Sequence, residues 1–330
     1  MLEVIEKEGI VGNYRIIRQM GRGGMGVVYE VESIDNGKHF ALKVFTSDGT
    51  HSDFLRKRFI AEGKLLSRLN HSHLVKVYEV SIDEVTKSPF FIMDLVLSEN
   101  GEPCTLEVYR RQGRLDERQI ALIYADLRDA LIYLHGEGVV HRDIKLENVL
   151  IGADGRAILS DFGVSRIFRS ELREAISVTT TFVSDRVPIM GSAGYLSPEL
   201  KAGASATPSD DAWALGVLVF RLLTGVWYEA DSQAMEFIAG FDPEWQQLLE
   251  KLLNANPKKR IPLAEPPKLY SDNSLLFKYI KGLKGRVYIL VILFVLVVVG
   301  CWAAFTMFFE SSEKYSFDEF FPASEGVNIR

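Results

Sequence analysis

Cysteine is scarce in this chain: Cys104 and Cys301 are the only two among 330 residues. They lie far apart, and neither belongs to a C-x-x-C pair, the spacing typical of zinc ligands and redox pairs. The sequence therefore argues against a disulfide framework and against a cysteine-based zinc site. Such sparing use of cysteine fits a reducing compartment for residues 1–286.

A basic excess is missing as well. The chain has 38 lysines and arginines against 44 aspartates and glutamates, which gives a net charge of −6 at pH 7. Nucleic-acid binders usually carry the opposite balance, so no nucleic-acid partner is expected. The N-terminal region contains acidic charge and no long apolar run, which argues against a signal peptide. The sequence also contains no internal repeat and no long low-complexity tract.

Long uncharged runs are missing except at residues 287–309, where 23 residues carry no formal charge. A helix of that length spans roughly 34 Å, enough for a hydrocarbon core of about 30 Å. The alternative is a buried helix of a soluble core, where uncharged runs beyond about 18 residues are rare. Basic residues cluster at 281–286 and acidic residues dominate after the run, so the positive-inside rule places the N-terminal side in the cytoplasm. We therefore predict a single-pass membrane protein.

The sequence pattern divides the chain into five segments. They are a leader at 1–12, a folded domain at 13–262, a juxtamembrane linker at 263–286, the span at 287–309 and a short extracytoplasmic tail at 310–330. Within the folded domain, β-rich runs come first and helical patterns later, which predicts an α+β chain with two lobes. The predicted strands cover 14–18, 27–31 and 40–45, and the predicted helices cover 53–69, 118–135, 211–224 and 244–253.

A glycine cluster follows the first predicted strand. It has the sequence Gly21-Arg22-Gly23-Gly24-Met25-Gly26 and leads into a β-rich run. Alone, this pattern suits a dinucleotide site, a flexible hairpin or a loop over ATP phosphates. A dinucleotide site needs a helix directly after the glycines. The strand that follows here therefore favours the loop over ATP phosphates.

Lys43 lies on a predicted strand, flanked by apolar residues. On its own it is best explained as an edge-strand lysine, and Glu62, inside the next helix, as a solvated face residue. The functional alternative is an ammonium group directed at nucleotide phosphates, with Glu62 holding it as an ion pair.

The decisive pattern has two parts. The sequence HRDIKLEN spans residues 141–148, and a DFG triplet begins at Asp161, eighteen residues after Asp143. In this arrangement Asp143 orients the attacking hydroxyl and accepts its proton, while Asn148 and Asp161 bind Mg²⁺. Carboxylate and amide oxygens are the hard ligands that Mg²⁺ needs. The order and spacing of both parts, after a glycine loop and a strand lysine, point to phosphoryl transfer from ATP.

With these motifs, residues 13–262 resemble the eukaryotic-like protein kinase superfamily, and most of all the bacterial membrane-anchored serine/threonine kinases. Residues 191–199 resemble the substrate-docking loop and the APE motif of that family, with Ser197 in place of alanine. Asp211 lies in a segment similar to the buried helix that anchors the catalytic loop, and Arg260 matches the arginine that pairs with the APE glutamate, here Glu199. The resemblance implies an α+β, two-lobed protein kinase fold with a β-rich N-lobe and a helical C-lobe. It also implies a location at the bacterial inner membrane, with the kinase domain in the cytoplasm.

The resemblance assigns roles to individual residues as well. It implies that Asp143, Lys145 and Lys43 are catalytic, that Asn148 and Asp161 hold Mg²⁺, and that Lys145 marks the serine/threonine branch. ATP contacts are expected from the glycine loop, the strands behind it and the hinge after the gatekeeper Met93. The expected ATP-contacting residues are Gly21, Arg22, Gly23, Gly24, Met25, Gly26, Val28, Ala41, Lys43, Glu62, Met93, Asp94, Val96 and Leu150.

The expected partners are protein substrates with serine or threonine acceptors. The segment between Asp161 and Glu199 is rich in hydroxyl residues, and 179–181 is a run of three threonines. We expect autophosphorylation there to order the segment through bonds to Arg142, with a homodimer in the membrane plane allowing transfer in trans. The alternative is a Ser/Thr-rich loop that is simply solvated.

Two departures from the family pattern give further expectations. The stretch from Gly225 to Arg260 is shorter than usual, so the helix after Gly225 is expected to be abbreviated. Gly63 lies beside Glu62 in a predicted helix, at a cost of about 1 kcal/mol relative to alanine, so that helix is expected to be mobile. The short tail does not support an extracellular ligand-sensing domain.

Two rival functions deserve comparison with a protein kinase. A pseudokinase scaffold usually loses the strand lysine, the catalytic aspartate or the Mg²⁺-binding aspartate, and this chain has all three. A small-molecule kinase of the same fold, acting on aminoglycosides or choline, is disfavoured by the docking loop and the APE-like motif.

Overall fold

The computed structural model describes residues 9–23, 26–46, 52–113, 115–162, 166–167, 193–229, 236–260 and 262–263. The chain divides into two compact units, Met1–Leu276 and Phe277–Arg330, and every described residue belongs to the first. The predicted span at 287–309 and tail at 310–330 lie outside the described residues, as do nearly all of the predicted linker and most of the leader. Among the described residues, no helix has the length and apolar character needed to cross a membrane.

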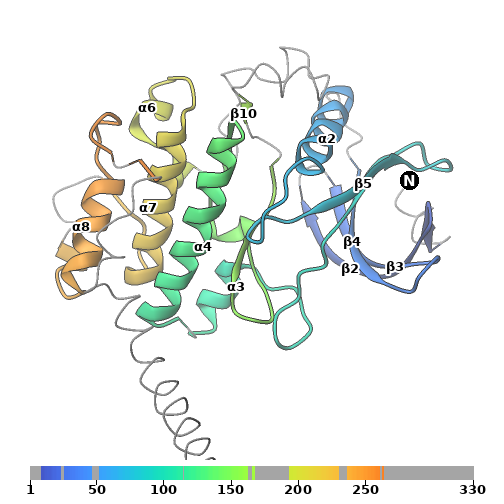
Figure 1. Ribbon diagram of the computed structural model, residues 1–330, viewed down its shortest axis with the longest axis horizontal. Helices are drawn as coiled ribbons and strands as arrows, with labels where there is room; N and C mark the ends of the chain where they lie inside the picture. Colours follow the sequence, from blue (N-terminus) through green and yellow to red (C-terminus); the bar gives the residue numbers. More distant parts are fainter. Residues whose placement is uncertain are drawn as a thin grey trace, which may run out of the picture. The chain divides into compact units, whose positions relative to one another are not determined.

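An antiparallel sheet of six strands forms the N-terminal lobe (Figure 1). Its spatial order is β1-β2-β3-β4-β6-β5, and helix α2 (Ser52–Leu66) packs on β5 and β6. The strands are β1 (Ile10–Val11), β2 (Tyr14–Gly23), β3 (Gly26–Ser33), β4 (His39–Phe45), β5 (Val77–Ile82) and β6 (Pro89–Met93). Valine and aromatic residues are frequent in these strands, and β6 is buried along nearly its whole length, as expected for a strand covered on both faces.

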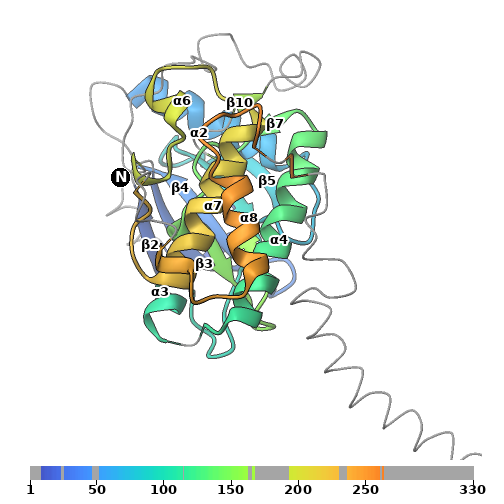
Figure 2. The same cartoon turned by 90° about the vertical axis from the view of Figure 1, so that its left-hand side faces the viewer.

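Helices dominate the C-terminal lobe (Figures 1 and 2), where α7 packs against both α4 and α8. The helices are α3 (Leu106–Arg111), α4 (Glu117–Gly136), α6 (Pro198–Lys201), α7 (Pro208–Thr224) and α8 (Pro243–Leu252). Helix α7 is buried from Asp210 through Phe220, so it forms the centre of this lobe. It begins with proline at its first position and ends at Gly225, whose φ of 76° suits a glycine C-cap.

Short elements between α4 and α6 carry the segment with the HRD and DFG motifs. The antiparallel pairs are β8 (Val149–Ile151) with β9 (Ala157–Leu159), and β7 (Val139–Val140) with β10 (Arg166–Ile167). The 3₁₀ turns in this part of the chain are η1 (Leu146–Asn148) and η3 (Ala193–Tyr195), and a further one, η4 (Glu236–Ile238), lies between α7 and α8. Strands β7 and β8 flank residues 141–148, and this fixes both ends of the loop that carries the HRD motif.

The two-lobed α+β fold predicted from the sequence is confirmed. The predicted strands and helices are all present, but several ends differ, and the helix predicted at 53–69 stops at Leu66. Strands β1 and β5 to β10 and helices α3 and α6 were not predicted, because these elements are too short to show a distinct periodicity. Between α7 and α8, the described residues 225–229 and 236–242 contain only the 3₁₀ turn η4, in keeping with the abbreviated helix expected there.

Candidate active site

A cavity of about 440 Å³ lies between the sheet and the C-terminal lobe. Nearly all of the predicted ATP-contacting residues line it, from Gly21 to Leu150, together with the predicted Mg²⁺ ligands. Gly24 and Met25 lie outside the described residues. The volume is in the range of small-molecule sites, and the lining combines apolar walls with a few polar groups. The structure therefore gathers residues from both lobes around one nucleotide-sized space.

Gly26 shows why the loop over this cavity needs glycine. A Cβ atom placed on Gly26 would lie only 2.1 Å from the carbonyl oxygen of Val44, across the β3–β4 pair. No side chain fits at that distance, so the turn into β3 can pass the neighbouring strand only as glycine.

Two carboxylates hold Lys43, which lies on the sheet side of the cavity. Its Nζ lies 2.8 Å from Oε1 of Glu62 and 3.7 Å from Oδ1 of Asp161. The Lys43 side chain is 14% exposed and that of Glu62 is 2% exposed, so their contact is shielded from water. Burial lowers the pKa of Lys43, but the two carboxylates outweigh burial and hold it above its ordinary value. The ammonium group therefore stays charged and points into the cavity.

Hydrogen bonds within the HRDIKLEN loop orient its polar side chains. Oδ2 of Asp143 accepts hydrogen bonds from Nζ of Lys145 at 2.6 Å and from Nδ2 of Asn148 at 2.8 Å. The same Nδ2 also donates to the carbonyl of Asp143 at 2.8 Å. Asn148 is buried, and these two bonds fix the orientation of its amide. The amide oxygen of Asn148 is therefore the atom offered to a cation.

Asp211 on α7 anchors this loop. Its two carboxylate oxygens accept the backbone N–H groups of His141 and Arg142, each at 2.9 Å, and Nε2 of His135 lies 2.8 Å from Oδ2. Burial raises the pKa of Asp211, but the hydrogen bonds outweigh burial and hold it below its ordinary value. The anchoring holds Arg142 at φ 72°, a conformation that costs about 1–3 kcal/mol for a residue with a side chain. The ionised carboxylate thus stabilises a strained loop.

The donor set at Asp161 and Asn148 fits a magnesium ion. Both residues line the cavity, and both offer oxygen atoms, one from a carboxylate and one from an amide. Asp161 has φ 62°, and its side chain is 45% exposed, which leaves it open to a ligand that approaches through the cavity. Gly163, the third residue of the DFG motif, lies outside the described residues.

The backbone of the hinge is only partly available to a nucleotide. The N–H of Asp94 donates to the carbonyl of Lys76 at 3.0 Å, and its carboxylate accepts the Tyr78 hydroxyl at 2.6 Å. Because the bond to Lys76 commits the backbone N–H of Asp94, a backbone donor to a purine would have to come from a later hinge residue, such as Val96.

The sequence analysis missed several residues that line the cavity. They are Met20, Leu66, Val75, Phe91, Pro103, Thr105, Glu147 and Ser160. Three of them, Met20, Glu147 and Ser160, stand directly beside a predicted residue, but Val75, Pro103 and Thr105 come from loops far from any motif. Thr105 is the N-cap of α3, and its Oγ1 accepts the N–H of Val108 at 3.3 Å. That capping pattern was the only local signal at Thr105, and it predicts a helix start, not a ligand contact.

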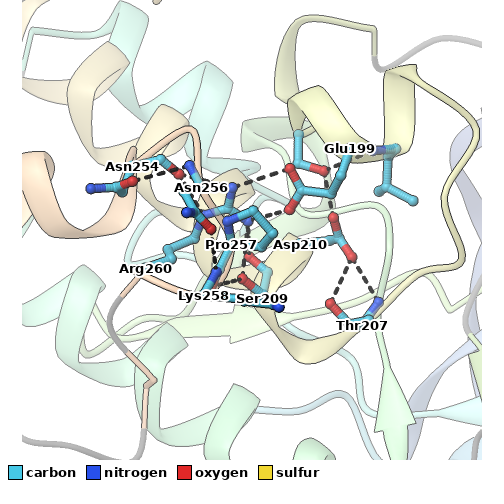
Figure 3. Close-up of polar contacts among 11 residues, drawn as sticks. Glu199, Thr207, Ser209, Asp210, Asn254, Asn256, Pro257, Lys258 and Arg260 are labelled. Carbon is cyan, nitrogen blue, oxygen red and sulfur yellow. Dashed lines mark hydrogen bonds and ion pairs between the residues drawn. The ribbon is translucent and has the colours of Figure 1, made fainter.

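Arg260 and Glu199 form an ion pair within the C-lobe (Figure 3). The guanidinium donates from NH1 and NH2 to the two oxygens of Glu199 at 2.6 and 3.2 Å, which is a bidentate pair. It also donates to the carbonyls of Ser209 and Asn254. The pair expected from the resemblance is therefore present, between the start of α6 and the segment after α8.

Ser197, the serine in the APE-like motif, has two partners. It is fully buried, its hydroxyl donates to Oδ1 of Asp210, and it accepts the N–H of Leu200 at 3.2 Å. Asp210 in turn accepts the N–H of Thr207 at 2.7 Å. Alanine could make neither side-chain bond, so in this chain the serine joins the starts of α6 and α7.

Comparison with known proteins places these observations in a family. Residues 14–267 match the protein kinase domain family. The probable serine/threonine-protein kinase PknB of Lactococcus lactis is 30% identical over 248 residues, which cover 74% of this chain and 36% of that protein. The serine/threonine-protein kinase PknA of Mycobacterium tuberculosis is 33% identical over 219 residues, which cover 65% of this chain and 47% of that protein.

A third relative has a similar match. The serine/threonine-protein kinase PrkC of Bacillus subtilis is 32% identical over 217 residues, which cover 66% of this chain and 31% of that protein. The matched part therefore spans less than half the length of each of these three relatives.

Proposed function

This chain belongs to the protein kinase family, and we propose that it is an ATP-dependent serine/threonine kinase that transfers the γ-phosphoryl group of ATP to hydroxyl groups of proteins. One observation carries the proposal: the two halves of the phosphoryl-transfer machinery meet at one cavity. Lys43 reaches Asp161 from the sheet, and Asn148, which lines the same cavity, is bonded to Asp143. These groups come from two lobes and are far apart in the sequence.

Each residue has a distinct role in the proposed reaction. Lys43, held by Glu62, places a positive charge beside the phosphates. Asp143 orients the acceptor hydroxyl and accepts its proton, and Lys145, 2.6 Å from its carboxylate, offsets negative charge that develops during transfer. Asn148 and Asp161 would hold Mg²⁺, which when bound neutralises phosphate charge. The remaining ATP contacts are proposed for the cavity-lining residues described above.

A serine/threonine substrate class is supported by two observations. Lys145 stands two residues after Asp143 and contacts it directly, as the serine/threonine branch of the family requires. The bacterial relatives are themselves called serine/threonine-protein kinases. We propose proteins as the substrates, since the docking-loop and APE-like motifs argue against a small molecule.

The second part of the proposal concerns membrane anchoring and activation. We propose that residues 13–262 are a cytoplasmic kinase domain, joined by a linker at 263–286 to a single span at 287–309 in the bacterial inner membrane, with a leader at 1–12 and a tail at 310–330. The uncharged run and the basic residues before it support this arrangement. Two chains tethered in one membrane would phosphorylate each other in the segment between Asp161 and Glu199.

The rival proposal is a scaffold of the same fold that does not transfer phosphate. A scaffold has no need to keep Lys43 paired at 2.8 Å or to orient the Asn148 amide. The paired lysine and the bonded catalytic aspartate therefore favour an active enzyme.

The test uses the full chain in detergent with labelled ATP, Mg²⁺ and a general protein substrate. Lys43→Met and Asp143→Asn should each reduce phosphoryl transfer by about 10²-fold or more, because one removes a phosphate-positioning charge and the other the proton acceptor. Matched controls are Lys38→Met and Asp154→Asn, which change exposed residues outside the cavity. Circular dichroism checks that each variant is folded. Near wild-type transfer by a folded Asp143→Asn variant would refute the assigned role, and an inactive wild type would favour the scaffold.

A further inference from the structure

Gly63 lies inside helix α2, directly after Glu62. A glycine in a helix interior costs about 1 kcal/mol relative to alanine, because it loses more backbone freedom on folding. Gly63 is buried, so solvent contact does not explain it. Either the helix gains from local flexibility, as the sequence alone suggests, or the surroundings leave no space for a side chain.

The surroundings leave almost no space. A Cβ atom built on Gly63 would lie 3.1 Å from Cδ1 of Phe91, and 3.1 and 3.3 Å from the two methyl carbons of Val80. These side chains come from β6 and β5, the two strands on which α2 packs (Figure 1). The helix backbone itself therefore rests on the sheet at this point, closer than a helix with a side chain there could approach.

Phe91 is packed against other side chains as well. It is fully buried, its ring centroid lies 4.9 Å from that of Phe59, and Nζ of Lys43 lies 5.4 Å from it. In the β4–β6 pairing, Phe91 is the residue directly opposite Lys43. An added methyl group would therefore either lift α2, which carries Glu62, or press Phe91 toward Lys43. Both movements disturb the 2.8 Å contact between Lys43 and Glu62.

We propose that Gly63 is a positioning residue that sets the distance between α2 and the sheet, and thereby holds Glu62 against Lys43. This inference rests on the proposed kinase function, because Lys43 acts on the phosphates of ATP. Gly63 does not line the cavity proposed to hold the nucleotide, whereas Glu62 does, so the effect of Gly63 passes through Glu62. The spacing account and the flexibility account predict opposite results for alanine: the first predicts weaker use of ATP, and the second predicts a stiffer helix with ATP use unchanged or improved.

The experiment measures steady-state kinetics of the full chain with ATP and with a peptide acceptor. Gly63→Ala should raise the KM for ATP and lower kcat/KM for ATP by roughly ten-fold, since small misplacements of a phosphate-positioning group have large effects. The KM for the peptide should stay unchanged, because Lys43 and Glu62 act on ATP in the proposed reaction. The matched control is Gly136→Ala at the end of α4, where an added Cβ would meet nothing within 4 Å. It should leave both KM values unchanged.

A second substitution supplies the rescue. Val80→Ala removes two of the three close contacts, and Val80 lies on the edge strand β5, where the structure can adjust. Val80→Ala alone should keep ATP kinetics near wild type, and Gly63→Ala/Val80→Ala should recover part of the lost kcat/KM, since the 3.1 Å contact with Phe91 remains. The same comparison can be made for stability. If Gly63→Ala does not fold, Gly63→Ala/Val80→Ala should be more stable than Gly63→Ala.

Three results would overturn the inference. One is a Gly63→Ala enzyme with wild-type ATP kinetics. Another is a loss of activity in which kcat falls without a change in the KM for ATP, as expected for a smaller folded fraction. The third is a defect, in kinetics or folding, that Val80→Ala does not relieve. A wild-type chain without phosphoryl transfer would instead refute the proposed function, so the two failures are distinguishable.

Discussion

Replacing Arg260 tests how much one buried side chain stabilises the C-lobe, since it forms hydrogen bonds to three separate segments. Its guanidinium is fully buried, and it donates to Glu199, to the carbonyl of Ser209 and to the carbonyl of Asn254. It also stacks over Trp213, with 5.0 Å between the guanidinium carbon and the ring centroid. Methionine at this position would keep much of the side-chain volume but has no hydrogen-bond donor.

The expected magnitudes follow from the groups left unpaired. Arg260→Met leaves the Glu199 carboxylate and two carbonyls without this partner, and breaking a buried pair in this way costs about 3–5 kcal/mol. Arg260→Lys keeps the charge, but one ammonium cannot reach all of the acceptors that the planar fork serves. One orphaned buried acceptor costs about 1–3 kcal/mol, so lysine should be intermediate.

Urea unfolding of the full chain, followed by tryptophan fluorescence, measures these differences. At about 2–4 °C per kcal/mol for a domain of this size, Arg260→Met should also lower the thermal midpoint by about 10 °C. Lys259→Met, an exposed neighbour, should change stability by no more than about 0.5 kcal/mol. If Arg260→Met fell within the range of that control, the bidentate pair would have no net stabilising effect and the reasoning would be wrong.

The pH dependence offers an independent check of the same pair. Burial raises the pKa of Glu199, but hydrogen bonds from Arg260 outweigh burial and hold it below its ordinary value. A lowered pKa in the folded state adds stability above the unfolded pKa of about 4.3, and this stability is lost as the pH falls through the folded pKa. The stability gap between wild type and Arg260→Met should therefore narrow below that pH. A gap that stays constant or widens in acid would contradict this assignment.

Three further predictions concern the serine of the APE-like motif, the membrane and activation. Ser197→Ala should destabilise the fold by about 1–3 kcal/mol in urea titrations, because it removes the N-cap of α6 and the bond to Asp210; a loss below about 0.5 kcal/mol would contradict this. Protease added to intact cells should remove at most the tail at 310–330, and digestion of residues 13–262 would overturn the proposed topology. Replacing the threonines at 179–181 with alanine should slow phosphorylation of an added peptide, because phosphate there would pair with Arg142. An unchanged rate, with no phosphate on these threonines in the active wild type, would remove this mechanism.

Much of the candidate active site could be named from the sequence, because the proposed chemistry depends on short motifs. The strand lysine, the HRDIKLEN run and the DFG aspartate were named from spacing, and Lys43, Asp143, Asn148 and Asp161 are linked in the structure. The sequence could not place Val75 or Thr105 at the cavity, because loop residues far from a motif carry no periodic signal. It also gave no reason to expect that the Asp94 amide is already bonded to Lys76.

The sequence by itself determined which residues have the side chains for the proposed phosphoryl transfer, since metal ligands, a proton acceptor and a phosphate-binding loop need particular side chains at particular spacings. It also determined the coarse order, β-rich runs first and helical patterns later, which local periodicity indicates. Only the tertiary structure decided why Ser197 replaces alanine and why Gly63 interrupts a helix. Both depend on contacts with residues distant in the chain, Asp210 for the serine and Phe91 with Val80 for the glycine. The space around a side chain is set by packing between elements, and no local pattern encodes it.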